Sequence, residues 1–158
     1  MTPAADLTHL RRAIAVSRAA RDHGNHPFGA LLVGPDGVVL LEAENTVTTG
    51  EDVTGHAETN LVRLAWREVD RDLLPRCTLV TSCEPCAMCA GAIYWSGIGR
   101  VVFGLAESGL RALTGDHDEN PTMALPCRQV LGAGSHGVEV SGPYLEDEAA
   151  AVHAGFWV

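Results

Sequence analysis

The sequence contains no lysine, so all 11 of its basic residues are arginines, and 20 acidic residues outnumber them. The formal net charge of -9 opposes electrostatic binding to a phosphate backbone, although a local basic patch is compatible with it. No apolar run approaches the roughly 18 residues that would span a bilayer. The N-terminus also lacks the basic, apolar and small-residue order of a secretory signal. These absences predict a cytoplasmic protein without a membrane span and make nucleic acid an unexpected partner.

The five cysteines are an odd number, which does not suit a disulfide framework in a chain without an export signal. Three of them fall within the stretch SCEPCAMCAG, where Cys86 and Cys89 form a C-x-x-C motif ahead of a run of small residues. This spacing indicates metal binding or redox chemistry. The other thiols are expected to behave as small buried hydrophobic groups; they are Cys77, Cys83 and Cys127.

At 158 residues and 46% hydrophobic, the chain fits one domain over 1–158. Hydrophobic periodicity and turn residues predict a helix, a β-hairpin, a second helix and then a β-α-β unit, which places helices on a sheet. The predicted helices are 7–21, 54–69 with Thr54 as N-cap, 86–97, 107–115 and 143–157. The predicted strands are 28–33, 38–45, 77–82, 100–105 and a weak edge strand at 137–142; the segment 116–126 has the composition of a loop.

Two sulfurs do not complete a zinc site. Among the seven histidines, only His56 lies at the start of a predicted helix with a carboxylate, Glu58, two residues further on. If the two helices begin at the same edge of the sheet, His56, Cys86 and Cys89 converge and leave the fourth tetrahedral position to water, which is typical of a catalytic zinc. Glu58 then remains available to move protons. The alternatives are a redox pair or simple packing for the cysteines, a structural histidine, and a carboxylate that only favours the helix dipole.

The combination H-x-E…P-C-x-x-C matches the signature of zinc deaminases that act on nucleobases. The segments HAETNLVRLA and TSCEPCAMCAGAIYWSGIGRVVFG resemble the cytidine deaminase-like superfamily, in the branch of bacterial guanine deaminases and tRNA adenosine deaminases. The resemblance runs from His26 to Glu107. It implies an α/β fold in three α/β/α layers around a central five-stranded mixed sheet, one zinc ion per subunit, and a homodimer or larger oligomer.

The resemblance implies a role for each matched residue. It makes Glu58 the proton shuttle and gives the zinc to His56, Cys86 and Cys89. Asn45 would contact the edge of the base, Ala57 would contribute backbone and Phe28 would form a pocket wall, although Asn45 could be only a turn residue and Phe28 only a core residue. An acidic residue and a C-terminal aromatic are also expected to contact substrate; the candidates are Asp116, Asp118 and Trp157, with His117 and Phe156 beside them.

Three functions stay open at this point. The resemblance is nearest to guanine deaminases, so hydrolysis of guanine to xanthine and ammonia is the favoured reaction, with cytosine, another aminopurine or an amino-triazine as alternative substrates. The second function is adenosine-to-inosine editing of a tRNA, which the acidic C-terminal segment LEDEAAAVHAGFW disfavours. The third is a zinc-stabilised module without activity, for which Glu58 would be dispensable. Trp66, Trp95 and Tyr94 are expected to serve core or dimer packing.

Overall fold

The computed structural model describes residues 3–121 and 123–158. Its strands are β1 (Gly29–Val33), β2 (Val39–Glu44), β3 (Thr78–Cys83), β4 (Arg100–Leu105) and β5 (Glu139–Ser141), and they form one sheet in the order β2-β1-β3-β4-β5. β1 is antiparallel to β2 and to β3, whereas β3, β4 and β5 are parallel. The expected five-stranded mixed sheet is therefore confirmed.

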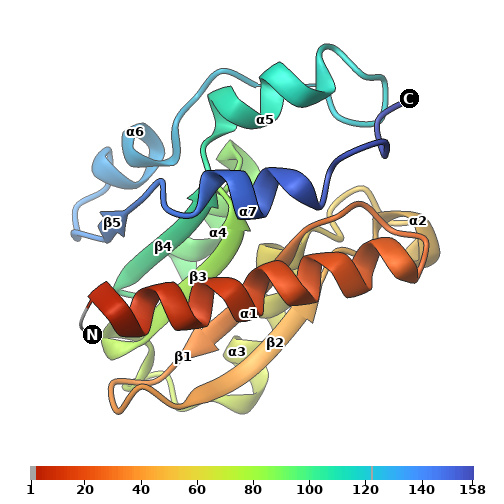
Figure 1. Ribbon diagram of the computed structural model, residues 1–158. Coiled ribbons are helices and arrows are strands. Elements are labelled where there is room, and N and C mark those ends of the chain that lie inside the picture. The colour runs from red at the N-terminus through yellow and green to blue at the C-terminus, as the bar shows by residue number, and fades with distance from the viewer. Residues whose placement is uncertain (1–2, 122) are drawn as a thin grey trace.

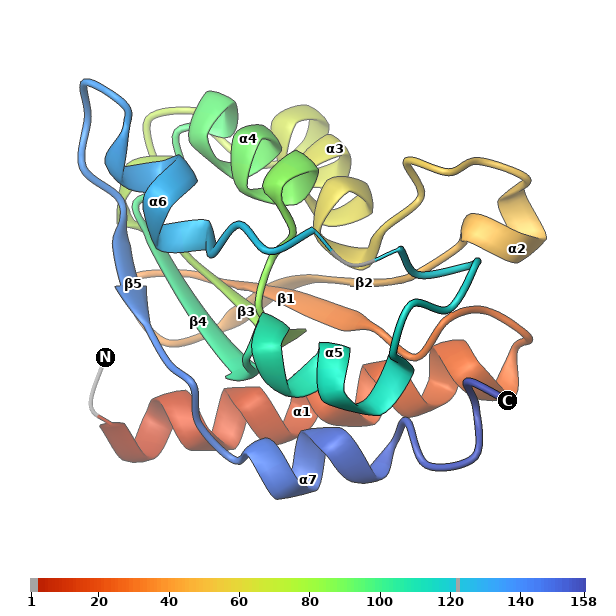
Figure 2. The same ribbon diagram turned by 90° about the horizontal axis from the view of Figure 1, so that it is seen from above.

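Helices cover both faces of the sheet (Figures 1 and 2). One face carries α1 (Pro3–Asp22) and α7 (Glu146–Ala151), and the other carries α3 (Ala57–Glu68), α4 (Ala87–Ser96) and α6 (Cys127–Gly132). The remaining helices are α2 (Val47–Gly50), α5 (Glu107–Thr114) and a 3-10 turn at Leu74–Arg76. This is the three-layer α/β/α arrangement expected from the resemblance.

Each face of the sheet packs a separate hydrophobic core. Leu31 lies in the core under α1 and α7, together with Leu10 and Val102. The next residue of the same strand, Leu32, lies in the core under α3 and α4 with Leu61. Successive side chains of a strand point to opposite faces, so a central strand between two helical layers is apolar at every position. This explains why GALLV in β1 and TLVTSC in β3 are buried throughout.

The structure corrects two expectations about helix ends. Thr54 does not cap α3; the N-cap is His56, and the Thr54 hydroxyl instead donates to Asp52 Oδ1 at 2.7 Å. The C-terminal segment is not one helix over 143–157, because α7 spans only Glu146–Ala151. Leu145 precedes it with a φ of 53°, a left-handed conformation that cannot belong to a right-handed helix. The short helices α2 and α6 were not predicted at all.

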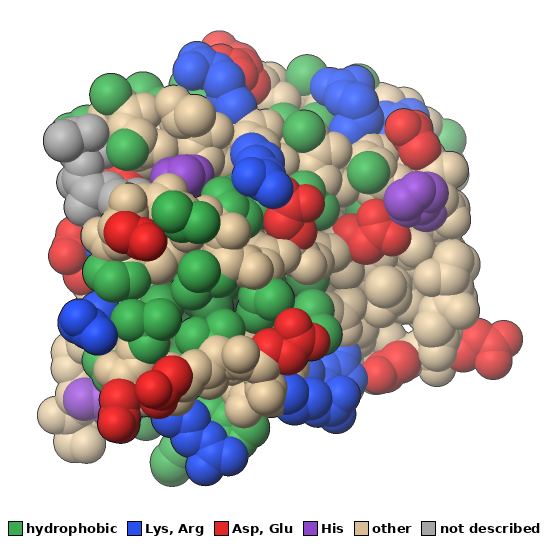
Figure 3. Space-filling model, turned by 90° about the horizontal axis from the view of Figure 1, so that it is seen from below, with side chains coloured by type: hydrophobic (Ala, Val, Ile, Leu, Met, Phe, Trp, Pro, Cys, Tyr) green, Lys and Arg blue, Asp and Glu red, His purple; other side chains and the backbone are tan. Residues whose placement is uncertain are grey.

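On the face drawn in Figure 3, arginines and carboxylates are interspersed around a band of hydrophobic side chains. In the parts of the chain that the structure describes, we find no helix with the length and apolar character needed to cross a membrane. The carboxyl ends of the parallel strands β3 and β4 lead into the N-termini of α4 and α5, and the functional groups gather at this edge of the sheet.

Candidate metal and active site

A histidine and two cysteines meet where α3 and α4 begin. His56 and Cys86 occupy the N-cap positions of the two helices, and Cys89 lies in the first turn of α4. His56 Nδ1 is 3.6 Å from Cys86 Sγ and 3.5 Å from Cys89 Sγ, and all three ligand atoms lie within 4.8 Å of one another. The predicted convergence of these three residues is confirmed.

These distances fit a tetrahedral zinc ion. With Zn–S of about 2.3 Å and Zn–N of about 2.05 Å, the tetrahedral angle places a ligating nitrogen and sulfur about 3.6 Å apart. The two N···S distances at His56 match this value. Among the described residues, no fourth His, Cys, Asp or Glu joins the group. Three protein ligands leave one position for water or substrate, as in catalytic zinc sites.

The ligand group favours the thiolate that a metal needs. The pKa of the Cys86 thiol is lowered to about 4, first by a hydrogen bond with Cys89 and then by one with His56. The pKa of His56 is raised, chiefly by the same contact with Cys86. The pKa of Cys89 is raised well above its ordinary value by its hydrogen bond with Cys86 and by burial.

Glu58 lies beside the ligands and is 5% exposed. Its Oε1 accepts a hydrogen bond from the Thr81 hydroxyl at 2.9 Å, and its Oε2 is 3.6 Å from Cys89 Sγ. Burial raises the pKa of Glu58, and the negative charge of Cys86 adds to this. A carboxyl group that is fixed by one oxygen and accepts a proton more readily than usual is suited to general acid–base chemistry.

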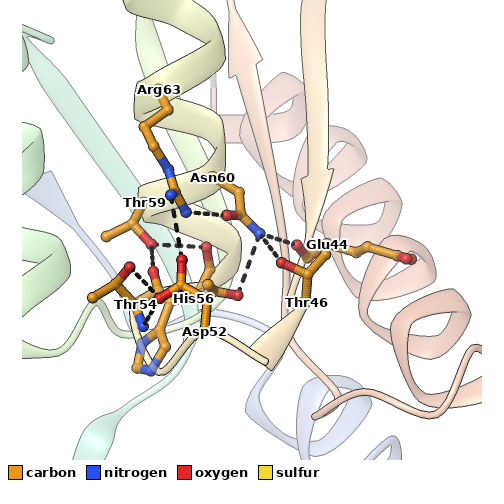
Figure 4. A network of polar contacts seen from close by, with 9 residues as sticks. Glu44, Thr46, Asp52, Thr54, His56, Thr59, Asn60 and Arg63 are labelled. Carbon is orange, nitrogen blue, oxygen red and sulfur yellow. Dashed lines mark hydrogen bonds and ion pairs between the residues drawn. The ribbon is translucent and has the colours of Figure 1, made fainter. Parts of the chain in front are cut away.

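The loop before His56 is held by the amide of Asn60, one turn into α3 (Figure 4). Asn60 Nδ2 lies 2.9 Å from the carbonyl of Glu44, 2.9 Å from Thr46 Oγ1 and 3.2 Å from the carbonyl of Gly55. Arg63 donates to Asn60 Oδ1. This single side chain therefore joins the end of β2 to the residue next to His56 and fixes where the histidine lies.

The ligands open onto a cavity of about 260 Å³. Its apolar wall includes Phe28, Val47 and Leu110. The polar lining carries four carboxylates and, among its described residues, no arginine; these carboxylates are Glu58, Glu84, Glu107 and Glu119.

Comparisons with known proteins agree with this geometry. Residues 3–105 match the family described as "Cytidine and deoxycytidylate deaminase zinc-binding region". The chain is 53% identical over 152 residues to a "Probable cytosine deaminase" of Schizosaccharomyces pombe, covering 96% of this chain and 92% of that protein. The chain belongs to this deaminase family. It is a zinc-dependent hydrolytic deaminase, and His56, Cys86 and Cys89 are positioned to bind the metal.

Two further relatives of the deaminase carry another substrate in their names. A guanine deaminase of Bacillus subtilis is 44% identical over 101 residues, which are 63% of this chain and 64% of that protein. A solved guanine deaminase from Nitrosomonas europaea superimposes with a TM-score of 0.75 at 27% identity, covering 91% of this chain and 80% of that one. These matches show the family and the fold, while the relatives' names give two different bases, cytosine and guanine, as substrates.

Of the residues expected to contact the substrate of the deaminase in the first half of the chain, one lines the cavity and two are buried near it. Phe28 lines the cavity, as expected of a pocket wall. Asn45 is buried and its Oδ1 accepts from the Val47 N–H at 3.0 Å, next to a lining residue. Ala57 is buried at the start of α3.

The candidates from the later part of the chain lie outside the described lining. Asp116 and Asp118 are exposed on the loop after α5. Trp157 packs behind the wall, with ring centroids 5.3 Å from His26 and 6.2 Å from Phe28.

Three lining carboxylates were missed by sequence reasoning. Glu84 is 8% exposed and accepts 2.9 Å hydrogen bonds from the N–H groups of Glu107 and Cys127, so it joins the starts of α5 and α6 to the cysteine loop. Burial and then the charge of Cys86 raise the pKa of Glu107 to about 7. One feature of the sequence could have pointed to Glu84: it is an ionisable residue directly after a fully buried strand, between Cys83 and Pro85. Glu119 directly follows Asp118, and no feature of the sequence distinguishes it as the acid that lines the cavity.

Proposed function

We propose that the chain deaminates a free nucleobase, replacing an exocyclic amine by oxygen from water and releasing ammonia. The observation that carries this proposal is the cavity: Glu58 lies beside the ligand group in a space of about 260 Å³ lined by four carboxylates. Such a lining repels phosphate. A base without sugar phosphate therefore suits the cavity better than a nucleotide or a tRNA loop.

In this proposal zinc, when bound by His56, Cys86 and Cys89, lowers the pKa of a coordinated water toward about 7. Glu58 is placed to take a proton from the attacking water, to deliver it to a ring nitrogen and then to protonate the departing ammonia. Thr81 holds Oε1 of Glu58, and Oε2 faces the ligand group, 3.6 Å from Cys89 Sγ. Phe28 supplies a flat apolar wall for the ring, and Asn45 is retained as a contact for the base edge.

The comparisons support two bases. Cytosine is the first, because the 53% identity extends over 152 of the 158 residues and so includes most of the α5–α6 loop that forms a cavity wall. Guanine, which the sequence motifs favoured, is the second, because the Nitrosomonas europaea structure covers 91% of this chain. The test is ammonia release from cytosine, guanine, adenine, ammeline and a tRNA anticodon stem-loop. Turnover of the stem-loop without turnover of any free base would reject the proposal.

A homodimer remains part of the proposal. Trp95 on α4 is 81% exposed and Met88 on the same helix is 40% exposed. The prediction that Trp95 packs in the core is therefore wrong. We propose the alternative prediction, that Trp95 packs against a second copy of the chain. Tyr94, in contrast, stacks on His136 with ring centroids 4.0 Å apart. Light scattering of the wild type and Trp95→Glu tests this point, since the substitution should yield monomers.

A further inference from the structure

Two helices that border the cavity begin without a side-chain cap of their own. Ala106 is the N-cap residue of α5 and Pro126 is that of α6, and neither makes a side-chain hydrogen bond to its helix. The first N–H groups of an α-helix have no partner inside the helix, so a buried helix start needs an acceptor from elsewhere. One side chain supplies this acceptor to both helices, and it belongs to neither.

That side chain is Glu84, which lies directly after β3 and is buried. Its Oε2 accepts from the N–H of Glu107, the first residue of α5, and its Oε1 accepts from the N–H of Cys127, the first residue of α6, both at 2.9 Å. The N–H of Glu84 donates to the carbonyl of Leu105 at 2.8 Å, which fixes Glu84 to the sheet. Negative charge is favourable at a helix N-terminus, and here one carboxylate serves two of them.

The chain between these two hydrogen bonds forms one wall of the cavity; we call residues 107–127 the wall segment. Among its described residues, those that line the cavity are Glu107, Leu110, Glu119, Asn120, Pro121 and Met123. A second cavity, of about 180 Å³, adjoins the wall segment at Glu84 and is lined by Arg111 and Leu125 among others. Side chains do not close-pack against the wall segment at this point, so its position depends more on hydrogen bonds at its two ends.

We propose that Glu84 is a positioning residue for the substrate: it holds both ends of the wall segment at the end of β3, and binding of the base depends on this hold. The inference rests on the proposed deamination of a free base. Cys86 follows Glu84 by two residues, so the wall and a metal ligand are carried by the same strand end. Both oxygens of Glu84 already serve N–H groups, so Glu84 acts through the wall and not on the reacting atoms.

The test uses Glu84→Gln, which replaces one acceptor oxygen by an NH₂ group that can only donate. Hydrogen exchange at the N–H of Glu107 or of Cys127 should become at least about 10-fold faster, the value of one hydrogen bond to a charged group. KM for the best free base should rise by about 10-fold, because fewer molecules have the wall in place. The kcat should stay within about 3-fold, because the wall contacts substrate and transition state alike. Glu84→Asp keeps the charge and should restore part of the wild-type KM.

The matched control is Asp6→Asn. Asp6 is a buried carboxylate that accepts two hydrogen bonds from Arg100, at 2.9 and 2.8 Å, where β4 begins and the cavity is at the other end of the strand. This variant should lose stability and leave KM and local exchange at both N–H groups unchanged. Zinc content and circular dichroism show whether each variant is folded and loaded.

A folded, zinc-loaded Glu84→Gln variant with unchanged exchange at both N–H groups would overturn the proposal. Faster exchange with an unchanged KM would make Glu84 a structural cap only, and would also overturn it. The exchange measurement needs no substrate, so it separates this proposal from the proposed function. A wild type that deaminates no free base, together with faster exchange in the variant, would overturn the proposed function and leave the hold on the wall segment in place.

Discussion

Replacing Asn60 should loosen the loop that positions His56. Its Nδ2 group serves the carbonyls of Glu44 and Gly55 and the hydroxyl of Thr46 (Figure 4). Each hydrogen bond contributes about 1 kcal/mol; the three acceptors are partly buried, and the Gly55 carbonyl keeps the Thr46 N–H as a second donor at 2.8 Å. Asn60→Ala should therefore lower the free energy of unfolding by about 2 to 3 kcal/mol. Asn60→Asp should lower it further, because it sets a carboxylate against three oxygen atoms.

Urea unfolding of the zinc-loaded protein measures this effect, and the rate of zinc release to a chelator measures its consequence at the site. Both Asn60 variants should release zinc about 10-fold faster, as expected when a group that orients a ligand is removed. Arg63→Ala is the control, because it removes the exposed partner of Asn60 Oδ1 and an exposed ion pair with Asp52 and keeps the three acceptors served. Unchanged unfolding midpoints and zinc release in Asn60→Asp would refute the reasoning.

Glu58→Gln should retain zinc, measured by metal analysis, and lose about 10²- to 10⁴-fold in kcat, because the amide cannot carry the proton; full turnover would exclude the mechanism. Glu84→Ala should cost about 2 to 4 kcal/mol in urea unfolding, because two N–H groups lose their acceptor; a change below about 0.5 kcal/mol would argue against this role. Burial lowers the pKa of His153 from 6.5 to about 4, so only the unfolded chain takes up a proton between these values. Stability should fall by about 3 kcal/mol from pH 7 to 4 on this account. His153→Gln should flatten that part of the pH profile, and an unaltered profile would contradict the assignment.

The sequence was sufficient for the parts of the fold that depend on local patterns. Gly34 and Gly37 flank the hairpin turn, and Gly97 ends α4 with a φ of 80°. The ligand group was also predictable, because His56 and Cys86 begin helices that follow recognisable signals. Each signal lies within a few residues of the atom that it positions.

The missed features depend on contacts between distant segments. AAAVHAGFW has the composition of a helix, but His153 and Trp157 pack against Phe28 and His26, and this packing outweighs helix propensity. The loop after α5 has no periodic sequence pattern, so the sequence does not indicate which of its acidic residues faces the cavity. The cavity receives Glu119, next to the predicted Asp118, because His26 is its partner.

Zinc-edge X-ray absorption on the purified protein tests the central claim most directly, because it reads the atoms around the metal. The account predicts one zinc per chain with two sulfurs at about 2.3 Å and two nitrogen or oxygen neighbours at about 2.0 to 2.1 Å, one of which is the imidazole of His56. Replacing Cys89 by serine should remove one of the two sulfurs. A shell of three or four sulfurs, or a second imidazole in the place of water, would contradict the open three-ligand site on which the proposed chemistry depends.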